Sequence, residues 1–91
     1  MYVRMVIGEA ISDEQAKEFQ RIVSEEDFSG QGYQGIQFLH EDGGNMLIVI
    51  TSWTTRDDCL QYHSSRAYRR FVAKTQHLLL GNFVVKLFRM E

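Results

Sequence analysis

Hydrophobic and polar residues alternate along four segments of the chain. The alternation has the period of two that is typical of a strand in a sheet, where successive side chains point to opposite faces. The sequence therefore predicts β-strands at residues 2–8, 33–40, 45–53 and 82–90. The segment 41–44, Glu-Asp-Gly-Gly, predicts a hairpin turn, so the second and third strands are expected to pair antiparallel.

The segment after the first strand has the longer period of an α-helix. Ser12, followed three residues later by Gln15, is typical of a helix start, with two acidic residues in the first turn. Gly30 and Gly32 break the pattern after the helix has faded. The apolar positions share one face of this helix, which is expected to point to the core, and they are Ala16, Phe19, Ile22 and Val23.

A second helical region is predicted to consist of two pieces. Thr55 begins it, with Asp58 three residues later. Ser64 and Ser65 are expected to break or re-cap the helix before it continues through residues 66–79. Gly81 ends it.

The resulting order, β-α-β-β-α-β, indicates an α+β fold of the ferredoxin-like type. We expect a four-stranded antiparallel sheet with the helices on one face. Residues 1–91 are expected to form a single domain, because a chain of 91 residues can bury one hydrophobic core.

Both faces of the predicted sheet carry apolar residues. One set is almost wholly apolar and is predicted to lie under the helices: Val3, Met5, Ile7, Ile36, Phe38, Met46, Ile48, Ile50, Phe83, Val85 and Leu87. The opposite set is mixed: Tyr2, Arg4, Val6, Tyr33, Gln37, Leu39, Leu47, Val49, Val84, Lys86, Phe88 and Met90. Because the mixed set is too apolar to leave in water, we predict a homodimer through the sheet faces. Arg4 and Lys86 are expected to reach the rim of that interface or a partner carboxylate.

Composition narrows the class of protein. Apolar residues make up 44% and charged residues 24% of the chain, as in ordinary soluble globular proteins. A net charge of −2 argues against general nucleic-acid binding. No apolar run approaches the roughly 20 residues that cross a membrane and no secretory signal opens the chain, so a cytoplasmic location is expected. The single cysteine, Cys59, is interpreted as a packing residue rather than a reactive thiol.

One titratable side chain is predicted to lie on the inner side of the second helical region. Leu60, His63, Ala67 and Phe71 follow helical spacing, so His63 is expected to point toward the sheet if the break at the serines is slight. An imidazole in that position either bonds a buried partner or faces a cavity. His40 and His77 are assigned to an exposed turn and a helix end, and no histidine pair has metal-ligand spacing, so no metal is expected.

Two neighbours of His63 complete the candidate group. Tyr62 is expected at the edge of the same stripe, with its ring buried and its hydroxyl wet. Trp53 ends the third strand, where a bulky aromatic side chain closes a core or faces a pocket.

Three motifs around these residues resemble those of the antibiotic biosynthesis monooxygenase superfamily. The motifs are LIVITSW at 47–53, TTRDD at 54–58 and LQYHSSRAYRRF at 60–71. The resemblance implies a dimeric α+β barrel with a pocket in each protomer between the sheet and the helices. It also implies that oxygenase members need no cofactor, because the deprotonated phenol or quinol reacts with O₂ itself.

Carried onto this chain, the resemblance implies that His63 and Tyr62 are catalytic, with His63 as the base. Trp53, Tyr68 and Phe71 would bind the substrate, a small aromatic molecule. Two alternatives stay open. The first is a ligand-binding or assembly module of the same fold without catalysis. The second is a haem-binding or haem-degrading protein, which the absence of an Asn from the first strand makes a poorer match.

Overall fold

The four strands form one antiparallel sheet in the computed structural model, which describes residues 1–91. The strands are β1 (Tyr2–Glu9), β2 (Tyr33–His40), β3 (Met46–Trp53) and β4 (Val84–Arg89), in the spatial order β2-β3-β1-β4. The helices are α1 (Asp13–Glu25), α2 (Arg56–His63) and α3 (Arg66–Thr75), followed by the 3₁₀ turn η1 (Gln76–Leu78).

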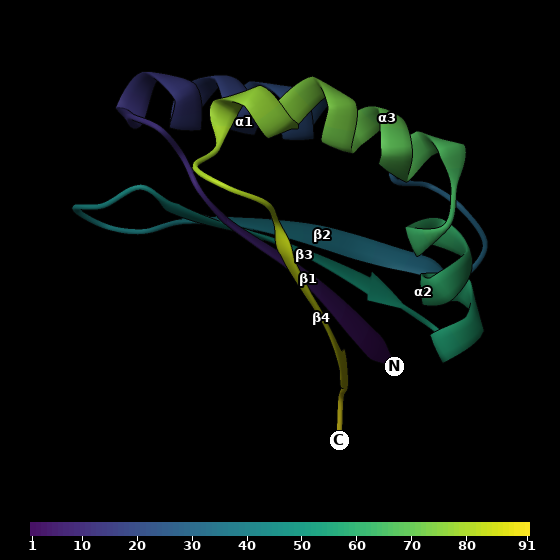
Figure 1. The fold of residues 1–91 in the computed structure, drawn as a ribbon. Helices are drawn as coiled ribbons and strands as arrows, with labels where there is room; N and C mark the ends of the chain where they lie inside the picture. The colour runs from purple at the N-terminus through teal and green to yellow at the C-terminus, as the bar shows by residue number, and fades with distance from the viewer.

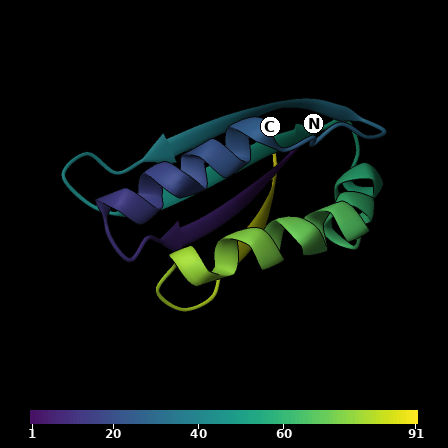
Figure 2. The same cartoon turned by 90° about the horizontal axis from the view of Figure 1, so that it is seen from above.

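The helices cover one face of the sheet, as Figure 1 shows, and the opposite face is open. Seen from above, α1 and α3 run side by side across that face, and α2 lies at one end (Figure 2). The predicted ferredoxin-like α+β arrangement is therefore confirmed, with the second helical region split into α2 and α3. None of the helices combines the length and apolar character that crossing a bilayer requires.

Local chemistry explains where the split helices begin. The hydroxyl of Thr55 accepts a hydrogen bond of 3.1 Å from the backbone N–H of Asp58. The hydroxyl of Ser65 accepts one of 3.1 Å from the backbone N–H of Tyr68. Each bond satisfies one of the free N–H groups of a first helical turn. The predicted helix start at Thr55 and the re-capping at the serine pair are both confirmed.

The predicted facing of the two central strands was wrong. In β1 the buried residues are Arg4, Val6 and Gly8, and in β3 they are Leu47, Val49, Thr51 and Trp53. Arg4 pairs with Thr51 and Val6 with Val49, and cross-strand partners share a face, so these residues all lie under the helices. The prediction held for Phe38, Phe83, Val85 and Leu87, which pack against the core.

The reversal has a physical reason. Both alternating sets of β1 and β3 are rich in apolar side chains, so hydrophobicity alone could not choose between them. The prediction assigned the set with the charge to the outside, whereas Arg4 is only 3% exposed. Val3, Met5 and Ile7 lie on the open face instead and are half-buried.

The orientation of α2 also differs from the prediction. Cys59 and Tyr62 are its buried apolar residues, whereas Leu60 is 37% exposed and His63, which was predicted to point toward the sheet, is also exposed. The chain leaves helical geometry at Ser64 and Ser65, so α2 and α3 are separate helices whose buried faces need not continue one another. Phe71 on α3 remains in the core.

Candidate functional site

A buried guanidinium lies at the centre of the candidate site. The Cζ atom of Arg4 lies 4.1 Å from the ring centroid of Tyr68 and 5.4 Å from that of Tyr62. Its Nη2 donates a hydrogen bond of 2.9 Å to Nδ1 of His63. Its Nε is buried and has no hydrogen-bond partner. Arg4 therefore joins the central strand β1 to the last residue of α2 and to the first turn of α3.

This arrangement determines the hydrogen-bonding state of His63. A guanidinium only donates hydrogen bonds, so Nδ1 of His63 must carry the lone pair, and the neutral ring then has its hydrogen on Nε2. His63 is exposed as a residue, but partial desolvation of its ring, and secondarily the charge of Arg4, lowers its pKa below the ordinary value of 6.5. The ring also stacks on Tyr68, with centroids 5.3 Å apart. His63 is therefore neutral at pH 7 and fixed in orientation.

A cavity adjoins this pair. Its volume is about 270 Å³, and it lies between α2 and the inner side of the sheet, bounded by Arg4, Cys59, Leu60, His63, Val85 and Leu87. Four of its six lining residues are hydrophobic, so the polar groups of Arg4 and His63 are its main sources of specific interaction. Burial raises the pKa of the Cys59 thiol, and the Arg4 charge offsets this in part, so the thiol stays protonated.

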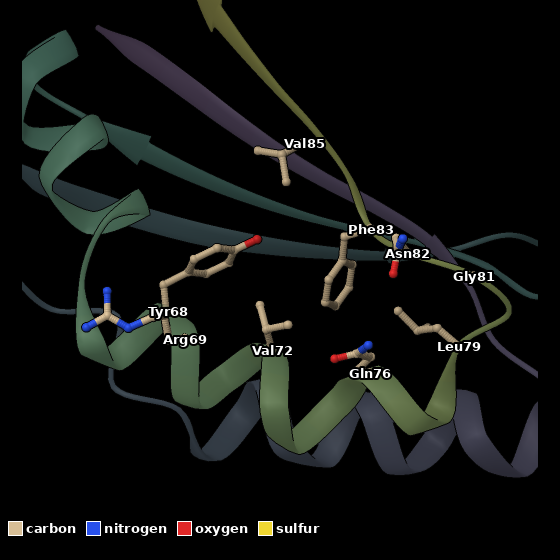
Figure 3. A pocket seen from close by; sticks show the side chains of 9 residues that line it. All are labelled: Tyr68, Arg69, Val72, Gln76, Leu79, Gly81, Asn82, Phe83 and Val85. Atoms are coloured by element: carbon tan, nitrogen blue, oxygen red, sulfur yellow. The ribbon is translucent and has the colours of Figure 1, made fainter.

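A second cavity of about 390 Å³ lies farther along the edge strand, between α3 and β4. Figure 3 shows its walls: Tyr68, Val72 and Gln76 line one side and Phe83 and Val85 the other. The hydroxyl of Tyr68 points into the space between the helix and the strand (Figure 3). Val85 lines both cavities. We refer to the two cavities together as the β4 cleft.

The remaining predicted site residues are divided between other places. Trp53 is 1% exposed and stacks on Tyr62 at a centroid distance of 5.1 Å. Both line a separate cavity of about 200 Å³ that also includes Asp58. Burial raises the pKa of the Tyr62 hydroxyl. Phe71 lines none of these three cavities and packs against Phe28 in the core.

The structure therefore brings His63 and Tyr68 together at the β4 cleft. Trp53 and Tyr62 line a separate cavity, and Phe71 lies in the core. Sequence reasoning missed Arg4 as a site residue. The available signal was a charged residue within an otherwise apolar stretch of β1, which the prediction interpreted as a rim position. No group of three or more His, Cys, Asp or Glu side chains is placed to hold a metal ion.

Comparison with known proteins gives structural matches only. No protein-family model matches the sequence, and no curated protein matches it significantly. A "putative antibiotic biosynthesis monooxygenase" from Bordetella bronchiseptica has a TM-score of 0.80 at 9% identity, over 99% of this chain and 97% of that one. A protein described in the same words from Deinococcus radiodurans has a TM-score of 0.78 at 11% identity, over 100% and 93%. A dimeric ferredoxin-like protein of unknown function from Thermobifida fusca has a TM-score of 0.76 at 14% identity, over 99% and 92%.

These likenesses define the class of fold. Each match spans almost the whole of both chains, so the full β-α-β-β-α-α-β arrangement is shared. The sequence resemblance to antibiotic biosynthesis monooxygenases is thus confirmed at the level of the fold. Because one fold hosts many activities, the chemistry must be argued from the site.

Proposed function

We propose that this protein is a cofactor-independent monooxygenase that binds a small phenol or quinol in the β4 cleft and oxidises it with O₂. The observation that carries the proposal is the position of His63, a neutral imidazole fixed by Arg4 and Tyr68 at the edge of a mostly apolar cavity. The names of the Bordetella and Deinococcus neighbours support the same reaction class.

The reaction requires the protein to remove a proton and shield an anion. A phenol with a free ring position takes up one oxygen atom to give a quinone, while the second oxygen atom leaves as water. The substrate supplies all four electrons, and no external reductant is needed. The phenolate donates electrons to O₂ far more readily than the neutral phenol, so the protein accelerates the reaction by stabilising the phenolate away from bulk water.

His63 is the proposed base for this step. A general base must be unprotonated at the working pH, and the lowered pKa of His63 keeps its ring unprotonated at pH 7. Its one basic lone pair is on Nδ1 and accepts the hydrogen bond from Arg4 in this structure. The substrate proton therefore passes to Nδ1 once the hydrogen bond from Arg4 is released.

Oxygen consumption tests the proposal. We expect uptake above the rate of autoxidation with some member of a panel of naphthols and hydroquinones, and one labelled atom in the product when the oxygen is isotopically labelled. His63→Ala should abolish uptake. His40→Ala is the matched control, because His40 is exposed near the hairpin and contacts only the carbonyl of Gly44 through its ring. Binding without any uptake across the panel would favour a non-catalytic ligand-binding module.

We also propose that two protomers associate through the open face of the sheet. That face carries the half-buried Val3, Met5, Ile7, Ile48 and Ile50. Leu39, Val84 and Phe88 extend it and are each more than 45% exposed. Such a surface is large and apolar for a monomer, and a two-fold axis would cover it with its own copy. The Thermobifida neighbour is described as dimeric, which supports this assembly.

The oligomeric state is measurable by sedimentation. Ile48→Lys places a charge at the middle of the open face, on the central strand β3, and should convert a dimer to a monomer. Gln20→Lys adds the same charge on the exposed side of α1 and should leave the dimer intact. A wild-type protein that sediments as a monomer would contradict the proposal.

A further inference from the structure

Arg4 carries a buried positive charge that forms no ion pair within the chain. The residue is 3% exposed, and its Nε has no hydrogen-bond partner. The ion pairs of the structure involve Lys17, Arg21, Lys74 and Arg89, and none involves Arg4. Buried charges in proteins are normally paired with an opposite charge, so this one requires an explanation.

The groups around Arg4 are all neutral. Tyr68 and Tyr62 present ring faces to the guanidinium, and His63 presents a lone pair. Burial raises the pKa of the Cys59 thiol and of the Tyr62 hydroxyl, so both of these groups stay protonated at neutral pH. The ring faces and the lone pair orient the guanidinium but leave its charge uncompensated.

A second protomer on the open face would not supply the missing charge. Arg4 and its neighbour Val6 lie on the helix side of the sheet, whereas the proposed interface is on the opposite side. Of the cavities described above, the β4 cleft is the one that adjoins Arg4, because Arg4 itself lines its smaller cavity. A counter-charge must therefore enter through the cleft.

We propose that Arg4 is the recognition group for an oxyanion carried on an aromatic ligand, so that the β4 cleft selects an acidic aromatic compound, a carboxylate or a phenolate, over its neutral analogue. The oxyanion would accept hydrogen bonds from the free N–H groups of Arg4. Hydrogen bonds between two charged groups are stronger than those between neutral groups. The aromatic ring would lie against Leu60, Val85 and Leu87, which line the same cavity. This inference deepens the proposed function and rests on it for the place where the ligand binds.

Binding of matched probes tests the inference without any need for turnover. 2-Naphthoate and 2-naphthamide have nearly the same shape and differ in charge, and calorimetric titration gives the affinity of each. We expect naphthoate to bind at least about tenfold more tightly, the ratio that a hydrogen bond to a charged group provides. Acetate tests the contribution of the ring and should bind more weakly than naphthoate. 2-Naphthol separates a phenolate site from a carboxylate site, because it binds well only if the site deprotonates it.

Two variants assign the preference to Arg4. Arg4→Gln removes the charge and keeps a hydrogen-bonding side chain, so naphthoate should lose its advantage over naphthamide. Arg21→Gln removes one positive charge from the exposed side of α1 and is the matched control, because Arg21 lies outside both the cleft and the open face. Circular dichroism establishes that both variants are folded. Equal binding of naphthoate and naphthamide to the wild type, or undiminished naphthoate binding to folded Arg4→Gln, would overturn the inference.

NMR of the His63 ring gives a second readout that does not depend on the folding of a variant. The charge of Arg4 contributes to the lowered pKa of His63. An anion on Arg4 offsets that charge, so saturating naphthoate should raise the pKa of His63, whereas naphthamide should not. An unchanged pKa in the naphthoate complex would contradict contact with Arg4.

Failure of the inference and failure of the proposed function have different signatures. Anion binding that depends on Arg4, without oxygen uptake by any phenol, supports the inference and refutes the oxygenase. Oxygen uptake that is equal in the wild type and in Arg4→Gln, with no preference for naphthoate, supports the oxygenase and refutes the inference.

Discussion

Replacement of Arg4 by methionine should leave the protein as stable as the wild type or more so. The residue is 3% exposed and lies among aromatic rings in the core, where loss of a large side chain ordinarily costs several kcal/mol. Methionine has a similar length and packs well against aromatic rings such as that of Tyr68. The substitution therefore removes the charge while it fills most of the same space.

Opposing contributions determine the size of the effect. Burial of an ion costs several kcal/mol even after the surroundings relax, and that cost disappears in Arg4→Met. The variant loses the cation–π contacts with Tyr62 and Tyr68, worth about 0.5–2 kcal/mol each, and a charged hydrogen bond to His63 worth about 1.5–3 kcal/mol. Nδ1 of His63 can bond water after the substitution, because His63 is exposed. The contact with Tyr62 is long and His63 is exposed, so the losses lie at the low end of these ranges, and we expect a net change between zero and about 2 kcal/mol of added stability.

Urea unfolding at fixed protein concentration measures this change, since a dimer would make the midpoint depend on concentration. For a domain of this size, each 1 kcal/mol shifts the melting temperature by roughly 4–8 °C. Arg21→Met is the control, because Arg21 is an exposed arginine whose ion pairs with Glu18 and Glu25 are screened by solvent, so its replacement should change the stability little. Destabilisation of Arg4→Met by about 3 kcal/mol or more, the usual result of breaking a compensated buried pair, would refute the claim that the charge lacks a partner.

Three further results are expected. NMR titration should give His63 a pKa below 6.5, because desolvation and the charge of Arg4 both disfavour its charged form. The contribution of His63 to stability should be complete above pH 6.5 and should decline as the pH falls through the pKa of the folded state. A His63 pKa at or above 6.5 would contradict the geometry. Ser65→Ala should lower the free energy of unfolding by about 1 kcal/mol, because it removes the cap of α3. Ser64→Ala should lower it less, because the Ser64 hydroxyl makes no hydrogen bond, and equal losses of stability would be inconsistent with the cap. Cys59 is 1% exposed with a raised thiol pKa, so a thiol reagent should modify it only as fast as the protein unfolds, and rapid modification of the native protein would show that it is reactive.

The features that the sequence predicted correctly depend on neighbouring residues. The order of strands and helices follows from local periodicity, and the caps at Thr55 and Ser65 follow from short side-chain bonds within one helical turn. These rules operate over three or four residues, so a single sequence contains all the information that they need.

The features that were predicted wrongly depend on distant residues. Which face of β1 is buried was ambiguous, because both faces are mainly apolar, and the choice depends on contacts between Arg4 and residues about 60 positions away in α2 and α3. Because the helix ends at Ser64, the periodicity of α3 does not predict which face of α2 is buried, and Tyr62 rather than Leu60 faces the core. No spacing rule specifies such contacts.

The most informative error concerns Arg4, and it bears on what the site does. An apolar side chain at this position would continue the buried surface formed by Val6 and Val49, and a sequence selected only for stability would be expected to have one. A charge without a partner beside a cavity is the kind of local conflict that proteins retain at functional sites at a cost in stability. If that explanation is correct, Arg4→Met changes stability and anion binding in opposite directions. A merely structural arginine would lose stability when replaced and would leave the preference for naphthoate unchanged, so the signs of the two effects together distinguish the explanations.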